Sequence, residues 1–132
     1  TDQSTGIQWY NGVSIITNSA ESGVGTGKGN TQSIIIFQGV GSYAASICAG
    51  YGEGGFSDWY LPSQYELNLM WLNIGQGNAL GLGNVGGFAN NNYWSSSEYG
   101  INLARFQYFG NGFQGNLNKD YGFTYVRAVR AF

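Results

Sequence analysis

The residue types that most often carry catalysis are scarce in this chain of 132 residues. Histidine is absent, so the commonest general base and the commonest metal ligand are both missing. The run Ser95-Ser96-Ser97 therefore lacks the imidazole that normally activates a serine nucleophile. Cys48 is the single cysteine, which excludes an internal disulfide and favours a buried, inert thiol. We therefore expect a protein that is not an enzyme.

Sequence patterns for nucleotide or metal binding are incomplete. GTGKGN has no Ser or Thr after Lys28, and GYGEGG matches GxGxxG but follows a predicted helix instead of a strand. Asn116, Asn118 and Asp120 are spaced like the alternate oxygen ligands of a calcium loop, yet Arg127 occupies the position of the bidentate Glu. We expect a solvated polar turn and no cofactor there, with calcium at these three residues as the alternative.

The composition limits the possible partners. Five basic residues are scattered along a chain of net charge −2, which argues against nucleic-acid binding because phosphate neutralisation needs clustered Lys and Arg. No stretch approaches the roughly 18 continuous apolar residues of a membrane span, so no membrane insertion is expected. A charged fraction of 9% with 17% aromatic residues is the opposite of the composition of disordered chains.

Three helical segments are predicted in the first half of the chain. Asn30 is a candidate N-cap ahead of the run TQSIIIFQ, and SYAASICAG (42–50) reads as a second short piece. The third helix, 61–73, has the clearest start, because Ser63 and Glu66 have the spacing of a capping box. Few of its residues are polar, so this helix is expected to be well buried.

Strands are predicted mainly in the second half. Asn11-Gly12, within 7–16, is a typical hairpin dipeptide. The later strand candidates are separated by Asn/Gly turns and cover 93–97, 103–109, 112–116 and 124–132. Helices followed by strands indicate an α+β fold, and residues 1–132 are expected to form a single domain.

Three segments together resemble a known family. They are GIQWYNG (6–12), GFSDWYLPSQYELNLMW (55–71), and YWSSSE (93–98) with the closing YVRAVRAF (125–132). In order and spacing they resemble the C-terminal domain of the Legionella collagen-like adhesin and the larger bacterial and phage family built around DW-LP, YWSS-E and VRAVR. The resemblance covers nearly the whole chain.

The resemblance implies a C-type-lectin-like fold with a twisted antiparallel sheet. It also implies an extracellular tip on a bacterial cell or virion, where a homotrimer on a collagen-like stalk or fibre binds glycans or a host receptor. Relatives usually carry a further strand ahead of GIQWYNG, so we expect that strand to lie outside residues 1–132 or to come from another chain. The EPN, QPD and WND tripeptides of calcium-dependent lectins are missing, and basic residues are few, so stacking and amide contacts are expected to carry sugar recognition.

The predicted ligand site is the stretch 99–121, where the resemblance implies exposed strands and loops. Aromatic rings offer flat apolar faces to sugars, and amides both donate and accept hydrogen bonds, as hydroxyls require. Alternation along strands turns some residues inward, and Leu103, Phe106 and Phe109 are expected there. The predicted ligand contacts are Tyr99, Asn102, Arg105, Gln107, Tyr108, Asn111, Phe113, Asn116, Asn118, Lys119 and Tyr121.

The motif residues are expected to stabilise the fold instead. They are Asp58, Trp59, Glu66, Trp94, Glu98, Arg127 and Arg130. The two tryptophans are placed in the core because large aromatics dominate core energetics. The carboxylates Asp58 and Glu98 are expected to pair with the two arginines or to accept hydrogen bonds from backbone N–H groups.

Two other functions remain open at this point. The domain could be the repeating subunit of an extracellular filament assembled through sheet edges, because low charge and an uncovered apolar edge favour self-association. An enzyme related to the formylglycine-generating group is the weaker alternative, since it would need Cys48 exposed beside ionisable partners.

Overall fold

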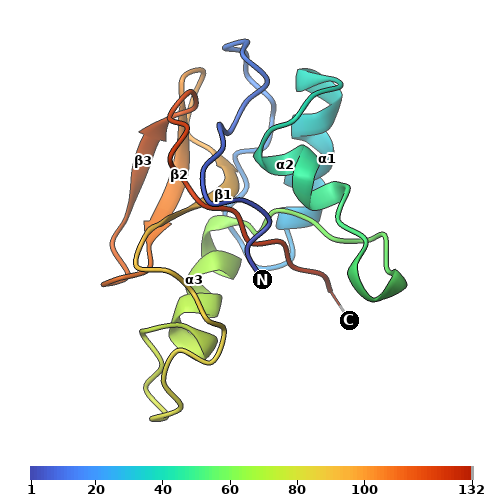
Figure 1. The fold of residues 1–132 in the computed structure, drawn as a ribbon. Helices are drawn as coiled ribbons and strands as arrows, with labels where there is room; N and C mark the ends of the chain where they lie inside the picture. Colours follow the sequence, from blue (N-terminus) through green and yellow to red (C-terminus); the bar gives the residue numbers. More distant parts are fainter. Residues whose placement is uncertain (132) are drawn as a thin grey trace.

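Helices precede strands along the chain in the computed structural model, which describes residues 1–131 (Figure 1). The elements are α1 (Gly27–Gln38), α2 (Ala44–Ala49), the 3-10 turn η1 (Glu53–Gly55), α3 (Gln64–Ile74), β1 (Asn92–Glu98), β2 (Leu103–Tyr108) and β3 (Gln114–Asn118). The strands form one antiparallel sheet in the order β1-β2-β3. The predicted α+β layout, with helices first and an antiparallel sheet second, is confirmed.

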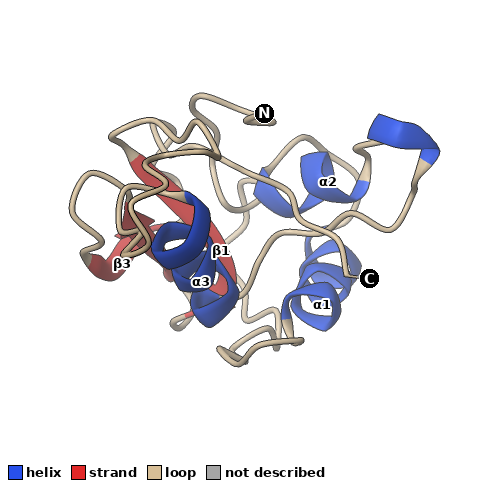
Figure 2. Cartoon of the chain, turned by 90° about the horizontal axis from the view of Figure 1, so that it is seen from below, coloured by secondary structure: helices blue, strands red, loops and turns tan. Residues whose placement is uncertain are grey.

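The sheet separates α3 from the α1–α2 pair (Figure 2). On one face, Leu67 of α3 packs in a cluster with Tyr93 of β1 and Phe109, which follows β2. On the other face, Trp94 of β1 packs in the main core with Ile34 of α1. Adjacent strand residues thus point into two different clusters, as alternation along a strand requires.

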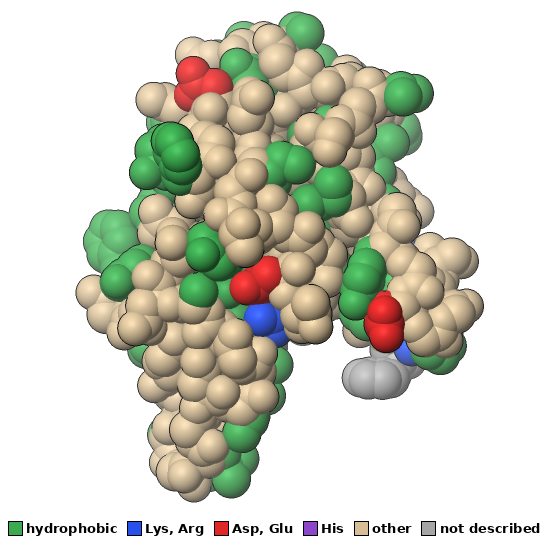
Figure 3. Space-filling model, in the orientation of Figure 1, with side chains coloured by type: hydrophobic (Ala, Val, Ile, Leu, Met, Phe, Trp, Pro, Cys, Tyr) green, Lys and Arg blue, Asp and Glu red, His purple; other side chains and the backbone are tan. Residues whose placement is uncertain are grey.

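The sequence predicts the capping of α3 correctly, but it does not predict how exposed the helix is. Ser63 Oγ accepts from the Glu66 N–H at 3.4 Å and Glu66 Oε1 accepts from the Ser63 N–H at 2.8 Å, which confirms the capping box. The prediction of a well-buried helix is wrong, because Tyr65, Leu69 and Leu72 are 54%, 43% and 41% exposed. Only one face of α3 rests on the sheet, and no described element covers the other. Hydrophobic side chains indeed appear across the surface in Figure 3, among few charged ones.

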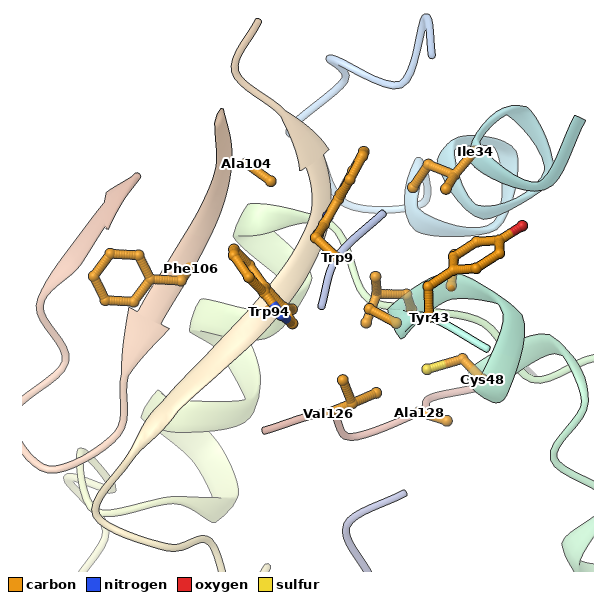
Figure 4. Close-up of a cluster of buried hydrophobic side chains, with 12 residues drawn as sticks. Trp9, Ile34, Tyr43, Cys48, Trp94, Ala104, Phe106, Val126 and Ala128 are labelled. Carbon is orange, nitrogen blue, oxygen red and sulfur yellow. The ribbon is translucent and has the colours of Figure 1, made fainter. Parts of the chain in front are cut away.

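Two tryptophans anchor the main core (Figure 4). Trp9 and Trp94 are fully buried, and each indole N–H donates to a backbone carbonyl, that of Ser95 and Ile7 respectively, at 2.8 Å. The segment around residue 9 is thereby fastened to β1, more than eighty residues away in sequence. The core position predicted for Trp94 is confirmed, whereas Trp59 is only partly buried, at the edge of this core.

The start of α1 lies before the predicted N-cap. Asn30 sits inside the helix, where its amide turns inward and donates to the Glu21 carbonyl at 2.6 Å. The free N–H of Gly27 is instead satisfied by Glu66 Oε1 at 3.0 Å, so a carboxylate from α3 caps α1 from outside. Glu66 therefore joins the N-termini of two helices, a role that its local sequence does not indicate.

Two predicted β elements are wrong. The 7–16 segment forms no hairpin, because the Asn11 amide donates to the Gln38 and Val40 carbonyls at the end of α1 and holds the chain there. The 124–132 segment forms no continuous strand either. Its described part makes isolated bridges from three residues to three distant parts of the chain, Tyr125 to Tyr93, Val126 to Ser4 and Val129 to Tyr60, while Phe132 lies outside the described residues.

Among residues 1–131, no helix has both the length and the apolar character needed to cross a bilayer. α1, the longest helix, has 12 residues, well short of the ~20 that span a hydrocarbon core.

Candidate functional site

The predicted ligand-binding stretch folds as β2, β3 and the loops around them. The register pairs Leu103 with Asn118 and Arg105 with Asn116, so these residues share one face of the sheet. Asn102 lies just beyond this pairing, and its carbonyl accepts from the Lys119 N–H at 2.8 Å. The end of β3 and the start of β2 therefore bring several predicted residues into one place.

Two of the predicted contacts are wrong, because their side chains lie inside the protein. Gln107 is 1% exposed, and its Nε2 donates to Asn68 Oδ1 at 2.8 Å and to the Gly112 carbonyl at 3.1 Å. Lys119 is also 1% exposed, and its ammonium pairs with Glu98 at 2.7 Å. Both side chains hold loops in place, and alternation along β2 sends Gln107 toward α3.

The other predicted residues stay at the surface but do not form one patch. Arg105 stacks on the Tyr99 ring, with its guanidinium carbon 4.6 Å from the ring centroid. At the opposite end of the sheet, Asn111 Oδ1 accepts from the Phe113 N–H at 2.9 Å and shapes the β2–β3 turn. Tyr121 is exposed, while Tyr108 is half-buried against the main core. Phe106 and Phe109 are buried, as predicted, and Leu103 is only half-buried.

A polar hollow of about 250 Å³ lies where the two strands meet the 10–14 segment. Its lining residues carry amide, hydroxyl, carboxylate and aromatic groups, and they are Tyr10, Ser14, Asn102, Asn118, Lys119 and Asp120. We call this site the polar hollow. Of the predicted ligand contacts, Asn102 and Asn118 line it with exposed side chains, while Lys119 lines it with its side chain buried.

The polar hollow is assembled around Lys119. The Trp9 N–H donates to the Lys119 carbonyl at 2.9 Å, which brings the neighbouring Tyr10 to the hollow. The Lys119 ammonium donates to the Ile15 carbonyl at 3.1 Å, which fixes the loop that carries Ser14. The backbone carbonyl and the buried side chain of Lys119 thus position two stretches that lie more than a hundred residues away in sequence.

The buried Glu98 carboxylate pairs with this lysine, so the predicted pairing of Glu98 with an arginine is wrong. Glu98 does not pair with either arginine; its Oε2 contacts the Lys119 ammonium, and its two oxygens accept from the Thr17 N–H at 3.0 and 2.9 Å. The Thr17 hydroxyl donates to the same carboxylate at 2.9 Å. Acceptance from a backbone N–H was the other predicted role of Glu98, and that part is confirmed. A buried ion pair with these additional hydrogen bonds fixes the backbone beneath the polar hollow.

The two arginines pair elsewhere. Arg130 Nε donates to Asp58 Oδ1 at 2.8 Å, as predicted, and this hydrogen bond lowers the pKa of the Asp58 carboxyl. Arg127 Nε donates to Asp2 Oδ1 at 2.8 Å, a partner that the sequence motifs did not indicate. These pairs fasten the C-terminal segment to the first residues and to the 51–60 region.

The donor set of the polar hollow does not fit calcium. Asn118 and Asp120 line it, but Asn116 does not, and Asp120 is its only carboxylate. Ca²⁺ takes roughly six to eight oxygen ligands, and one carboxylate beside two amides falls well short of that set. Among residues 1–131, no three Asp, Glu, His or Cys side chains gather at any place.

Sequence reasoning missed two residues of the hollow. Tyr10 and Ser14 belong to the N-terminal part of the chain, and nothing in their local sequence marks a contact with residues 118–120. Tyr10 stands in the GIQWYNG segment, which was interpreted as part of a hairpin and as a family motif, but not as a binding segment. Knowledge of the Trp9–Lys119 hydrogen bond would have been needed to place it.

Comparison with known protein families gave a match over nearly the whole chain. A family model described as the Lcl C-terminal domain matches residues 1–130. No curated protein and no solved structure matched the chain. The matched range includes every helix and strand and all residues of the polar hollow.

Proposed function

The chain belongs to the Lcl C-terminal domain family, and from this premise we propose that it is an extracellular adhesin or receptor-binding domain that recognises uncharged glycans in the polar hollow. The observation that carries the proposal is a polar hollow lined by amide-, hydroxyl- and carboxylate-bearing residues, directly above the buried ion pair of Glu98 and Lys119. The adhesin character of the family supports a surface location, and a bacterial cell or a virion is the surface we propose. A C-type-lectin-like fold remains part of the proposal.

The chemistry of the hollow suits sugar hydroxyls. The amides of Asn102 and Asn118 each donate and accept, while Asp120 adds a carboxylate acceptor. Tyr10 also lines the site, half-buried and packed against the main core. The volume of about 250 Å³ lies just below the ~300 Å³ at which drug-sized pockets begin, so a single sugar ring is the expected occupant.

The charge balance favours a neutral ligand. The Lys119 ammonium is already paired with Glu98 at 2.7 Å, which leaves Asp120 as the only lining charge without an ion pair among the described residues. A sulfated polymer would meet a carboxylate and no free cation in this hollow. Uncharged glycans are therefore the ligand class we propose.

Such a site is weak by itself. Stacking and amide contacts at one small site typically give about −4 to −6 kcal/mol, which corresponds to millimolar to high-micromolar dissociation constants. Several copies on one particle raise avidity by about a hundredfold or more. We therefore propose that the domain works as a homo-oligomer, with a trimer as the expected state.

We also propose that the domain binds without catalysing a reaction. The chain contains no histidine, and burial raises the pKa of the Cys48 thiol well above its usual range, which leaves that group protonated. A buried, protonated thiol is a poor nucleophile. The enzyme alternative would require a reactive cysteine, so this observation argues against it.

A second function, subunit of an extracellular filament, is favoured by one observation. Large apolar side chains are exposed along α3 and the loop that follows it, namely Tyr65, Leu69, Leu72, Leu80, Leu82 and Val85. Exposed apolar surface of this kind marks protein contacts when it is contiguous. Light scattering on freshly isolated protein separates the two functions, since the adhesin proposal expects a discrete trimer and the filament proposal expects open-ended assemblies.

A glycan array tests the proposed ligand class. The native oligomer, applied to an array of neutral, sialylated and sulfated glycans, is expected to bind neutral glycans with little loss in high salt. Binding confined to sulfated glycans and abolished by salt would contradict the proposal, because such binding depends on free cations. The absence of binding to any glycan on the array would favour a protein receptor or the filament role.

A further inference from the structure

A second hollow lies on another side of the protein, between the C-terminal end of α3, the 51–59 segment and the C-terminal segment 127–130. Its volume is about 480 Å³, within the range of ligand pockets. In the view of Figure 3 it opens in the notch between the lower lobe and the right-hand lobe. We call it the aromatic cleft. None of its lining residues also lines the polar hollow.

The wall of the aromatic cleft is dominated by rings and aliphatic side chains. Tyr51 and Trp59 pack edge to face with centroids 4.9 Å apart, and Phe56 lies near them in the same wall. Met70 and Ile74 of α3 form the opposite side. Such a surface favours apolar groups, and it lacks the amides that line the polar hollow, apart from Gln3.

Two arginines of this wall have their guanidinium groups over aromatic rings. The Arg130 guanidinium carbon is 3.6 Å from the Phe56 ring centroid, and that of Arg127 is 4.1 Å from the Phe88 centroid. Each guanidinium is fixed on one side by a carboxylate, Asp58 for Arg130 and Asp2 for Arg127. A stacked and paired guanidinium is oriented in advance, so its remaining N–H groups can meet an acceptor with little further ordering.

These pairs leave the cleft without excess positive charge. Arg127 and Arg130 are each matched by one carboxylate, and Glu53 adds a negative charge at the rim. In the described part of the chain, no hydrogen bond uses Nη2 of Arg127 or Nη1 of Arg130. The cleft thus offers apolar volume and oriented donors, but it does not attract an anion.

We propose that the aromatic cleft binds an uncharged apolar side chain, aromatic or large aliphatic, presented on an extended segment of a partner polypeptide. The side chain fills the space between the ring wall and α3, and backbone carbonyls of the segment accept from the two guanidinium groups. Peptide carbonyls suit this role because they are neutral acceptors repeated along the chain. The inference does not depend on the polar hollow or on glycan binding.

The test uses a blocked tripeptide, acetyl-Ala-Phe-Ala-amide, titrated into the ¹⁵N-labelled native protein. The indole N–H resonance of Trp59 is the readout, because this indole lines the cleft and donates to the Glu53 carbonyl at 3.3 Å. A saturable shift is expected with the phenylalanine peptide, and at least a fivefold weaker response with acetyl-Ala-Ser-Ala-amide. The resonances of the buried Trp9 and Trp94 indoles stay unchanged and report on the fold.

Matched variants locate the binding. Phe56→Ala removes part of the wall, and Phe56 is 47% exposed, so the fold should survive; the apparent dissociation constant is expected to rise at least fivefold. Phe113→Ala removes a ring outside the cleft that is 61% exposed, and it is expected to leave the dissociation constant unchanged. An unsaturable Trp59 shift, equal responses to the two peptides, or full binding by the Phe56→Ala variant would overturn the proposal. Benzyl alcohol binding as tightly as the phenylalanine peptide would overturn the peptide part, because the backbone would then contribute nothing.

Discussion

The polar hollow and the aromatic cleft both depend on ion pairs, but they use them in opposite ways. In the polar hollow the charged pair Glu98–Lys119 lies beneath the site, and uncharged polar groups face the solvent. In the aromatic cleft the guanidinium groups of Arg127 and Arg130 lie in the wall itself, stacked on rings. Only 9% of the residues are charged, and the ion pairs they form fix loops. The character of each site is therefore set by the uncharged residues on those loops, which are polar at the hollow and aromatic at the cleft.

The two ion-pair systems differ most in depth. The side chains of Lys119 and Glu98 are 1% and 3% exposed, whereas those of Arg130 and Asp58 are 21% and 39% exposed. A buried pair leaves an uncompensated charge when one partner is removed, while water screens a half-exposed pair. The polar hollow should therefore depend on its ion pair for stability much more than the aromatic cleft does.

The largest effect is expected from Glu98→Gln. The change keeps the shape of the side chain but leaves the buried Lys119 ammonium without its counter-charge, so the free energy of unfolding should fall by about 3–5 kcal/mol. Urea denaturation followed by tryptophan fluorescence measures it. Asp58→Asn at the cleft is the matched control and should cost only a small fraction of that amount. Equal losses in the two variants would break the comparison.

The next effect concerns ligand binding at the polar hollow. Asn102→Ala and Asn118→Ala each remove an exposed amide from its lining, so affinity for a neutral glycan that binds the array should fall about tenfold. Urea midpoints should stay unchanged, because both side chains are exposed. Asn116→Ala is the control, since Asn116 is exposed on the same strand and face but lies outside the hollow. A comparable loss of affinity in the Asn116→Ala variant would show that the binding site extends beyond the polar hollow along the 99–121 stretch.

Acid should lower the stability of the protein by protonating Asp58, which pairs with Arg130 at the aromatic cleft. The hydrogen bond from Arg130 lowers the pKa of this carboxyl below its usual value near 3.9, so the folded state binds its proton less readily than the unfolded state. The resulting stability is present above about pH 4 and is lost as the pH falls through the folded-state pKa. Denaturation midpoints of the native protein and the Asp58→Asn variant, compared from pH 5 down to pH 2, should converge as the acid contribution disappears. Parallel curves would show that the pair contributes nothing to stability.

The smallest of these effects on stability is expected in alkali, where Tyr60 ionises. Burial, together with the nearby Glu66, raises the pKa of Tyr60 to about 12, so the folded state keeps this proton longer than the unfolded chain does. The associated stability is present below about pH 10 and is lost as the pH rises from there toward 12. Tyr60→Phe cannot ionise and should lose less stability over that interval, as measured by thermal unfolding at fixed ionic strength. A steeper loss in the variant would contradict this assignment.

The sequence predicted those parts of the fold that local chemistry determines. The capping box of Ser63 and Glu66 and the three sheet strands came from patterns confined to a few residues. The hairpin at Asn11 failed because its amide bonds to carbonyls at the end of α1, a contact across almost thirty residues. The final strand failed because its bridging residues pair with three different parts of the chain, which no alternation pattern can encode.

The candidate site was predicted in outline but not in composition. The family resemblance implied exposed strands and loops in the 99–121 stretch, and Asn102 and Asn118 do line the polar hollow. The misplacement of Lys119 has a physical cause: a long cationic side chain in a polar stretch is usually solvated, and here Glu98 and Ile15 draw it inward. Tyr10 was missed because only the tertiary fold brings it beside β3.

The most direct test of the central claim is a map of glycan contacts on the protein. The neutral glycan that binds most strongly on the array is titrated into the ¹⁵N-labelled protein, and the side-chain amide resonances of Asn102 and Asn118 are followed. The account predicts saturable shifts of both amides while the Trp59 indole in the aromatic cleft stays unchanged. Shifts at Trp59 without shifts at the two amides, or saturable shifts confined to the Asn111–Phe113 turn, would contradict it.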